Sequence, residues 1–226
     1  DTWLPEGAAI SYNAGISRRI EQRLIAEPGV TSVTTWVGSG VPRFYLPLDQ
    51  IFPQSNVSQF IVVPRDLRER EQLRLALPAI LAAEFPEVRA RVKLLPNGPP
   101  VPYPVQFRVV GVEPVTLRQK ADEVKQAMRQ NPNTRGVNDN WNENVKTLSL
   151  EVDQDKARAL GVSSQAIAQA VRLWATGSTV GQYREGDRLI DIVLRGQPGE
   201  RGRIDDLSST YVATAVGKSI PLSQIV

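Results

Sequence analysis

The sequence predicts an α+β fold built from small modules, and two observations carry this prediction. An apolar stripe at helical spacing followed by a strand-like run occurs three times within residues 1–143, which indicates repetition of a supersecondary unit. Residues 96–104 also hold five prolines. Because proline lacks an N–H donor and fixes its own φ, this segment predicts a stiff, extended connector between modules.

The first copy of the unit is expected in residues 1–36. A short strand at residues 1–4 comes first. The helix that follows has one apolar face at four-residue spacing, made by Ile16, Ile20 and Leu24. Glu27-Pro28 ends this helix, and the β-branched run from Val30 to Trp36 predicts the next strand.

The second copy begins with a strand at Phe60–Val63. The helix over Leu67–Phe85 has an apolar face made by Leu73, Leu77, Ile80 and Leu81. The run Val88–Leu94 then predicts another strand. Two βαβ units in one sheet give the split, ferredoxin-like arrangement, in which an antiparallel sheet carries its helices on one face. Residues 1–98 are therefore expected to form one complete subdomain.

The third copy supplies only half of a second such subdomain, over residues 99–143. Val105–Val110 alternates strictly and predicts a strand. The helical stripe consists of Leu117, Ala121, Val124 and Met128. A last strand is expected from Val137 to Trp141. A lone βαβ unit exposes its apolar helix face and an edge strand, so we expect its completing half to be missing from this chain.

Residues 144–226 have a different character and predict a separate α+β module. A strand is expected at Leu148–Val152. Asp153 and Ser163 are good N-caps for two successive helices; the first ends at Gly161, and the second has an apolar face made by Ile167, Val171 and Trp174. The strands expected after these helices are Thr179–Tyr183, Leu189–Leu194 and Thr210–Ala215.

The composition excludes several classes of function. The chain has no cysteine and no histidine, which removes thiolate chemistry, the usual general base and the commonest metal ligand. The net charge of +3 is too small to indicate nucleic acid as a partner. No apolar run is long enough for a membrane span. We therefore expect a soluble fragment that is not an enzyme and carries no cofactor.

A long connector over Gly38–Asn56 is the first candidate site. It is punctuated by glycine and proline and yet rich in apolar residues, so it is either a ligand-contacting loop or a surface hairpin that packs its own Phe44 and Tyr45. Aromatic residues near strand ends could line an apolar pocket, although such residues more often belong to a core: Trp36, Phe60 and Trp141.

Two acidic pairs are weaker candidates. Asp153 and Asp155 could hold a metal, but acidic residues at a helix N-terminus are favoured as caps, which is the reading we prefer. Asp187 and Asp191 could act as acid and base, but arginines close by in sequence favour surface ion pairs.

Several segments, in this order, resemble the second large periplasmic loop of resistance-nodulation-division (RND) efflux transporters of the AcrB/AcrD/AcrF type. They are Leu4–Gly7, Gly98–Val101, Pro104–Gly111, Val152–Ser163, Gly177–Gly186 and Val216–Leu222. The resemblance implies proton-driven multidrug export from the bacterial inner membrane, with this part on the periplasmic face. It assigns residues 1–98 to the first C-terminal porter subdomain, 99–143 to half of the second and 144–226 to the docking domain.

The resemblance also implies partners and a site. The partners would be the other protomers of a trimer, a periplasmic adaptor, an outer-membrane channel and hydrophobic or amphiphilic small molecules. The connector would be the switch loop between two drug pockets, with Gly38, Gly40, Pro42 and Arg43 in it. The implied substrate-binding residues are Thr34, Trp36, Phe44, Tyr45 and Phe60. The metal-exporting branch uses methionine ligands; the only methionine, Met128, lies on a helical stripe, so no metal site is expected.

Two other functions of ferredoxin-like folds fit the sequence less well. A ferredoxin-like hydrolase of the acylphosphatase type needs an arginine-bearing anion loop after its first strand, and Gly7–Gly15 holds no arginine. A ferredoxin-like RNA-binding module stacks bases on sheet aromatics inside a basic motif, whereas Val105–Val110 has one aromatic residue and no such motif.

Overall fold

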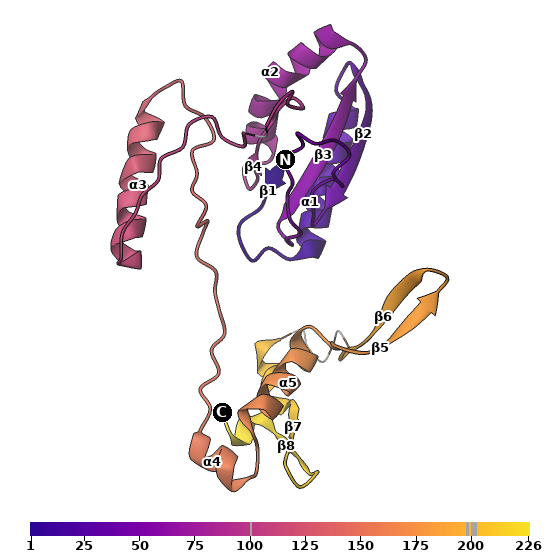
Figure 1. Cartoon of the computed structure of the whole chain (residues 1–226), viewed down its shortest axis with the longest axis vertical. Helices are drawn as coiled ribbons and strands as arrows, with labels where there is room; N and C mark the ends of the chain where they lie inside the picture. The colour runs from indigo at the N-terminus through magenta and orange to yellow at the C-terminus, as the bar shows by residue number, and fades with distance from the viewer. Residues whose placement is uncertain (100, 198, 200–202) are drawn as a thin grey trace. The chain divides into compact units, whose positions relative to one another are not determined.

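The computed structural model describes residues 1–99, 101–197, 199 and 203–226 (Figure 1). Pro100, in the proline-rich segment 96–104, lies outside the described residues. The chain divides into two compact units, Asp1–Lys146 and Thr147–Val226. Each unit combines helices with antiparallel strands, which confirms the predicted α+β class. The boundaries predicted at residues 98 and 143 stay a prediction.

The first unit contains a four-stranded antiparallel sheet. Its elements follow one another as β-α-β-β-α-β: β1 Thr2–Trp3, α1 Ile10–Ile25, β2 Val30–Val37, β3 Val57–Pro64, α2 Leu67–Glu84 and β4 Arg89–Ala90. The strands lie side by side in the order β2-β3-β1-β4, and every neighbouring pair is antiparallel. The predicted element order of residues 1–98 is therefore confirmed.

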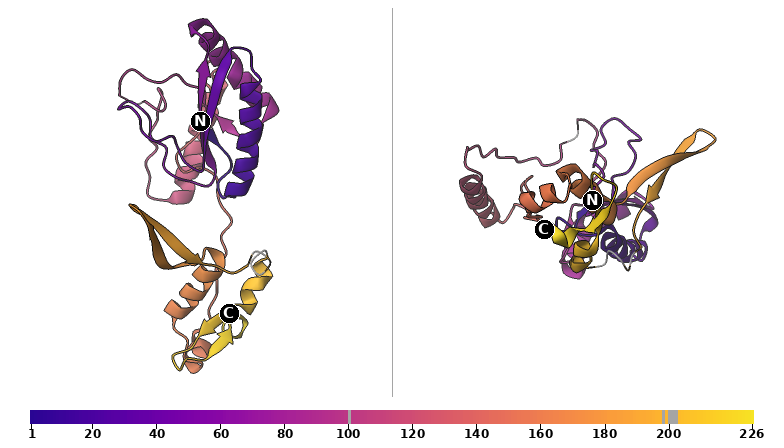
Figure 2. Two further views of the ribbon diagram at one scale, coloured as in Figure 1. Left: turned by 90° about the vertical axis from the view of Figure 1, so that its right-hand side faces the viewer. Right: turned by 90° about the horizontal axis from the view of Figure 1, so that it is seen from below.

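Both helices pack on one face of this sheet, where they form its core (Figure 2). The buried stripes are those that the spacing predicts, Ile16, Ile20 and Leu24 on α1 and Leu73, Leu77 and Leu81 on α2. Asp66 begins α2 because its side chain accepts a hydrogen bond from the Glu69 N–H at 2.8 Å. The core is therefore made by local periodicity acting on a paired sheet.

Strand β4 is much shorter than the predicted Val88–Leu94. Only Arg89 and Ala90 form a ladder, and both pair with the two residues of β1. A strand is assigned only where a partner offers hydrogen bonds, and β1 offers two positions. The prediction for Val88 and for residues 91–94 was wrong for this reason.

The segment after the sheet contains helix α3, Pro114–Gln130, as the apolar stripe predicts. The strands expected at Val105–Val110 and Val137–Trp141 are absent from the structure, so these two predictions were wrong. Among the described residues, neither run pairs with another strand. None of the residues of α3 is buried.

The second unit has a small core and a projecting hairpin (Figure 1). Its elements are α4 Gln154–Ala159, α5 Ser164–Ala175, β5 Ser178–Glu185, β6 Arg188–Leu194, η2 Ile204–Ser209, β7 Tyr211–Ala213, β8 Ser219–Pro221 and η3 Leu222–Gln224. Asp153 and Ser163 cap α4 and α5, which confirms the capping interpretation. The strand predicted at Leu148–Val152 does not form, because no described strand pairs with these residues.

The two longest strands of this unit pair only with each other. Strands β5 and β6 form a two-stranded sheet, and every residue of β6 is exposed. Across this hairpin the Asp191 carboxylate accepts a hydrogen bond from the Gln182 amide at 2.8 Å, and not from the arginines that the sequence suggested. Among the described residues, no helix has both the length and the apolar character that a membrane crossing requires.

Candidate functional site

The connector Gly38–Asn56 packs against the face of the sheet that the helices leave open. Val41 and Leu48 are buried in it. Its backbone is fixed at both ends, since the Gly38 N–H donates to Val57 O at 2.8 Å and the Gly40 N–H donates to Ile51 O at 3.1 Å. The Val41 N–H donates to Gln59 Oε1 on β3 at 2.7 Å. The connector is therefore a structured part of the unit.

Two glycines allow this close packing. Gly38 has a positive φ of 77°, and a Cβ there would lie 2.6 Å from the Ile10 Cδ1 atom. A Cβ on Gly40 would lie 2.8 Å from the Ile51 carbonyl oxygen, far inside van der Waals contact. Glycine is favoured at position 38 because of its positive φ, and at position 40 because a Cβ would push the two arms of the connector apart at Ile51.

A cluster of charged side chains holds the middle of the connector against the sheet. We call it the charge clamp, and it consists of Asp1, Asp49, Arg91 and Lys93. The Asp49 Oδ2 atom lies 3.0 Å from Arg91 Nη2 and 3.2 Å from Lys93 Nζ. The same Arg91 nitrogen lies 2.7 Å from the Asp1 carboxylate. The Arg91 guanidinium also lies over the Trp3 ring, 5.2 Å from its centroid. Four charged groups from three distant parts of the chain meet here.

The electrostatics of this cluster lower the pKa of two of its nitrogen groups, the Lys93 ammonium and the Asp1 amino group. Burial lowers the pKa of the Lys93 ammonium, the nearby Arg91 charge lowers it further, and the hydrogen bond to Asp49 opposes both effects. Burial also lowers the pKa of the Asp1 amino group to about 5, with the charges of Arg91 and Lys93 acting in the same direction. Asp49 is therefore an important counterion for the basic side of this cluster.

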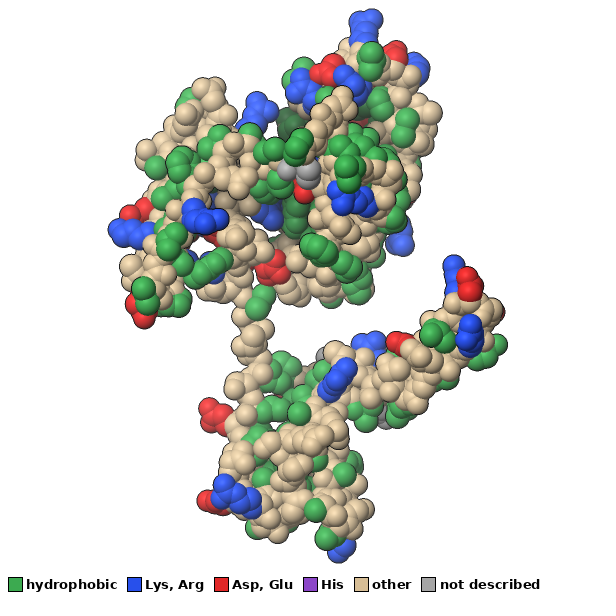
Figure 3. Space-filling view, in the orientation of Figure 1, with side chains coloured by type: hydrophobic (Ala, Val, Ile, Leu, Met, Phe, Trp, Pro, Cys, Tyr) green, Lys and Arg blue, Asp and Glu red, His purple; other side chains and the backbone are tan. Residues whose placement is uncertain are grey.

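The outer surface of the connector is apolar. Phe44, Leu46 and Phe52 are 58%, 78% and 70% exposed. Phe44 stacks on Tyr45 with ring centroids 5.3 Å apart, and the Tyr45 hydroxyl donates to Pro96 O at 3.1 Å. Figure 3 shows hydrophobic side chains gathered on the exposed surface of this unit.

The predicted substrate-binding residues fall into two groups. Trp36 pairs with Gln59 across the β2–β3 ladder, and Phe60 pairs with Thr35. Since paired residues share a face and neighbours along a strand alternate, Thr34 and Trp36 lie on the open face, beside the base of the connector. Phe60 lies on the helix-covered face. The structure therefore does not bring these residues into one pocket.

The other predicted residues, apart from Trp141, lie in the connector. Phe44 and Tyr45 are in it, as are Gly38, Gly40, Pro42 and Arg43, and the Arg43 guanidinium donates a hydrogen bond to the Leu46 carbonyl. Trp141 lies elsewhere in the unit, half-exposed beneath the Arg118 guanidinium at 5.6 Å.

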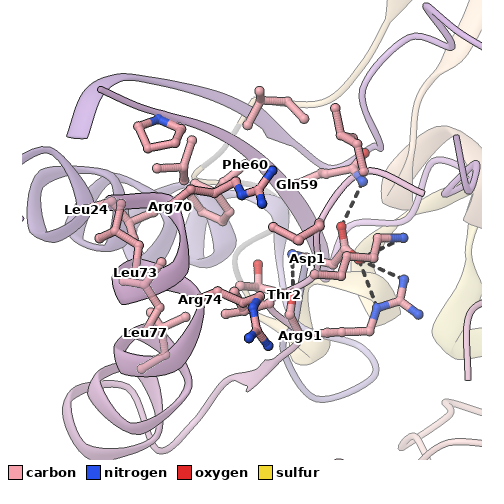
Figure 4. Close-up of a pocket in the computed structure, with 18 of the residues that line it drawn as sticks. Asp1, Thr2, Leu24, Gln59, Phe60, Arg70, Leu73, Arg74, Leu77 and Arg91 are labelled. Atoms are coloured by element: carbon pink, nitrogen blue, oxygen red, sulfur yellow. Dashed lines mark hydrogen bonds and ion pairs between the residues drawn. The ribbon is translucent and has the colours of Figure 1, made fainter. Parts of the chain in front are cut away.

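A separate cavity of about 570 Å³ opens between β3, residues 91–95 and the two helices (Figure 4). Leu24, Leu73 and Leu77 lie along its helical side, and the Asp1–Arg91 pair lies at its other side. Arg70 and Arg74 of α2 also line it. Of the predicted site residues, Phe60 lines this cavity and Thr34, Trp36, Phe44 and Tyr45 do not.

Sequence reasoning missed both the clamp and the cavity. A signal for the clamp was present, because Arg89, Arg91 and Lys93 alternate along a strand-like run and so share one face. The acidic partners come from residues 1 and 49, which no local pattern connects. Among the described residues, no group of three or more His, Cys, Asp or Glu side chains is arranged to hold a metal ion.

Comparison with known proteins gives a consistent result. A sequence profile of the AcrB/AcrD/AcrF family matches residues 2–226. An uncharacterized transporter of Haemophilus influenzae is 22% identical over 183 residues, which is 77% of this chain and 17% of that protein. The multidrug export protein AcrF of Escherichia coli is 32% identical over 87 residues, 38% of this chain and 8% of that protein.

The fold is also known from crystal structures. A heavy metal efflux pump matches 99% of this chain with a TM-score of 0.75 at 17% identity, and the match covers 24% of the pump. The chain spans less than a fifth of the length of the two curated relatives.

Proposed function

Because this chain belongs to the AcrB/AcrD/AcrF family, we propose that it is the periplasmic porter and docking part of an RND efflux pump. The parent protein is an integral protein of the bacterial inner membrane that exports drugs and amphiphilic compounds by proton antiport. Residues 1–98 are the first C-terminal porter subdomain, residues 99–143 are half of the second, and residues 144–226 are the C-terminal docking subdomain. The chain itself performs no chemical reaction.

The apolar face of the clamped connector is the observation that carries this proposal. Phe44, Leu46 and Phe52 are exposed on a loop whose backbone and charges hold it against the sheet. A fixed apolar surface can bind amphiphiles of many shapes, because the hydrophobic contribution of about 25 cal/mol per Å² depends on buried area and not on direction.

We assign the proposed substrate-contacting residues to two groups. Trp36 and Thr34 on the open face, with Phe44 and Tyr45 on the connector, form the binding surface. Phe60 acts from the helix-covered face, behind this surface. Gly38, Gly40, Pro42 and Arg43 shape the switch loop, and the glycine packing at Ile10 and Ile51 supports that role.

The partners of the pump are the other protomers of a trimer, a periplasmic adaptor and an outer-membrane channel. Support for protein contacts comes from the second unit. Its β5–β6 hairpin exposes seven large hydrophobic side chains, Val180, Tyr183, Leu189, Ile190, Ile192, Val193 and Leu194, and a large exposed apolar surface is typical of an interaction site.

Titration of the 226-residue chain with the apolar dye Nile red tests the binding surface. We expect Trp36→Ala and Phe44→Ala each to weaken binding by roughly ten-fold, because truncating an aromatic anchor costs about 1–2 kcal/mol. Trp141→Ala is the matched control, since it removes a half-exposed aromatic residue elsewhere in the unit. Unchanged affinity in both site variants would contradict the assignment.

A parallel titration with Zn²⁺ separates the two substrate classes found among the relatives of this chain. The proposal predicts no saturable Zn²⁺ binding at micromolar concentration. Saturable binding, together with unchanged dye affinity in the Trp36→Ala variant, would favour metal export.

A further inference from the structure

The two ends of the connector lie beside the start of helix α1. A short turn over residues 26–29 joins α1 to β2, so the two elements run in opposite directions and the start of α1 lies beside the end of β2. Strand β3 is antiparallel to β2 and begins at the same end of the sheet. The first turn of one helix therefore lies close to both the beginning and the end of Gly38–Asn56.

Ile10, the first residue of α1, packs on the glycine with which the connector begins. A Cβ on Gly38 would lie 2.6 Å from Ile10 Cδ1, so this side chain lies directly against the glycine backbone. The Gln54 N–H donates to Gly38 O at 3.0 Å, which joins the two ends of the connector. Ile10 itself is 50% exposed, so the core of the unit depends little on it.

Asn13, three residues later, holds the other end of the connector. Its side chain is buried, and its Nδ2 atom donates to Ser55 O at 2.9 Å and to Val57 O at 2.8 Å. The same Val57 oxygen accepts the hydrogen bond from the Gly38 N–H. One side-chain amide therefore binds the backbone on both sides of the point where the connector rejoins the sheet.

The surroundings fix the orientation of the Asn13 amide. Its Oδ1 atom lies 2.9 Å from the Ser58 hydroxyl and 3.2 Å from the Ser17 hydroxyl, and both serines are buried. A primary amide has two donor hydrogens and two acceptor lone pairs, and Asn13 uses all of them. Turning the amide over would place Oδ1 against two carbonyl oxygens. A fully paired buried network of this kind holds its members in one arrangement.

The buried face of α1 becomes polar where it reaches the connector. Further along the helix this face is apolar, with Ile16, Ile20 and Leu24 in the core. Asn13 and Ser17 continue the same face at helical spacing and are just as buried. An apolar side chain at position 13 would need no partners, whereas a buried amide is tolerated only when it is hydrogen-bonded. The exchange of apolar for polar residues therefore points to a role in geometry.

We propose that Ile10 and Asn13 form a seat that positions the connector, with Asn13 as the positioning residue. The charge clamp holds the middle of the connector, and the seat holds its two ends. Loosening the ends would leave the apolar surface around Phe44 less preorganised for a ligand, which lowers affinity. This effect on binding rests on the proposed function, whereas the effect on the connector backbone does not.

Hydrogen exchange of the Asn13→Ala variant of the 226-residue chain tests the seat. The amides of Gly40, Val41 and Gln54 report on the connector, since each is hydrogen-bonded within it or to β3, and the Ile20 amide in α1 reports on global unfolding. Relative to Ile20, we expect the three connector amides to exchange about ten-fold faster than in the parent chain, because the ends of the connector open locally. We expect the affinity for Nile red to fall several-fold.

Ser17→Ala is the matched control for this variant. It removes a buried polar group from the same face of α1, one that lies against Asn13 and Ser58 and makes no hydrogen bond to the connector. We expect the connector amides and the Ile20 amide to change together in this variant.

A second pair of variants tests the other contact of the seat without risk to the core. Ile10 and Ile25 are half-exposed isoleucines at opposite ends of α1. We expect Ile10→Ala to speed exchange of the connector amides about three-fold relative to the helix, because it removes the packing on Gly38. Ile25→Ala, the matched control, should leave this ratio unchanged.

Three results would overturn the proposal. Equal acceleration of connector and helix amides in Asn13→Ala would mean that Asn13 stabilises the core and positions nothing. Unchanged exchange in both Asn13→Ala and Ile10→Ala would mean that the connector keeps its place without the seat. Faster connector exchange with unchanged dye affinity, in a chain whose Trp36→Ala variant does bind dye more weakly, would separate the seat from binding. If neither Trp36→Ala nor Phe44→Ala changes dye affinity, the proposed function fails, and the exchange ratios still decide whether the seat exists.

Discussion

Helices α1 and α3 have the same kind of apolar stripe and similar lengths, and yet only α1 is buried. Helix α1 buries five of its 16 residues, whereas α3 buries none of its 17. The difference lies in the strands around them. Helix α1 lies between strands that pair in a sheet, while the runs on either side of α3 form no ladder. A stripe of apolar residues therefore specifies a helix, and a paired sheet decides whether that helix has a core.

Core truncations give the largest expected effect of this difference. Leu77→Ala removes a buried side chain between α2 and the sheet, and we expect it to lower the free energy of unfolding by about 2–5 kcal/mol. Leu117→Ala makes the same change on the half-buried stripe of α3, where we expect less than about 1 kcal/mol. Urea denaturation of both variants measures the two values, and equal losses would mean that α3 has a core of its own.

Removing part of the charge clamp is expected to lower the free energy of unfolding by less than a core truncation does. This variant asks how the connector, and not a helix, is held to the sheet. Asp49→Ala leaves Lys93 and Arg91 without one of their two carboxylate partners, and we expect a loss of about 1–3 kcal/mol in the free energy of unfolding of the first unit. The matched control is Asp155→Ala, which removes an ion pair with Arg158 that is almost fully exposed.

The control is expected to change stability by less than about 0.5 kcal/mol, because exposed ion pairs contribute little. Urea denaturation checks both variants. If Asp49→Ala proves as mild as the control, the connector is held by its glycines and backbone bonds alone, and the clamp is not needed.

Local patterns predicted most of the helices. The stripes of α1, α2 and α3 and the caps Asp153 and Ser163 depend on residues within a few positions of one another, and short-range spacing determines these features. The strands were less predictable. Val105–Val110 has the alternation of a strand, but alternation does not say whether a partner strand exists.

The candidate site was predictable only in part. The connector Gly38–Asn56 was recognised from its length and its apolar composition. That Phe60 faces away from Trp36 depends on the β2–β3 register, which joins Thr35 to Phe60 and which no local signal fixes. The clamp was missed because Asp49 and Arg91 are 42 positions apart.

Backbone hydrogen exchange of the whole chain tests the central claim most directly. That claim is that a paired sheet gives one helix its core and leaves the other without one. We predict that the amides of α1, and the β3 amides bonded to β2, exchange only on global unfolding of the first unit, while those of α3 and of Val105–Val110 exchange by local opening, at least a hundred-fold faster. Equal protection of α1 and α3 would contradict the account.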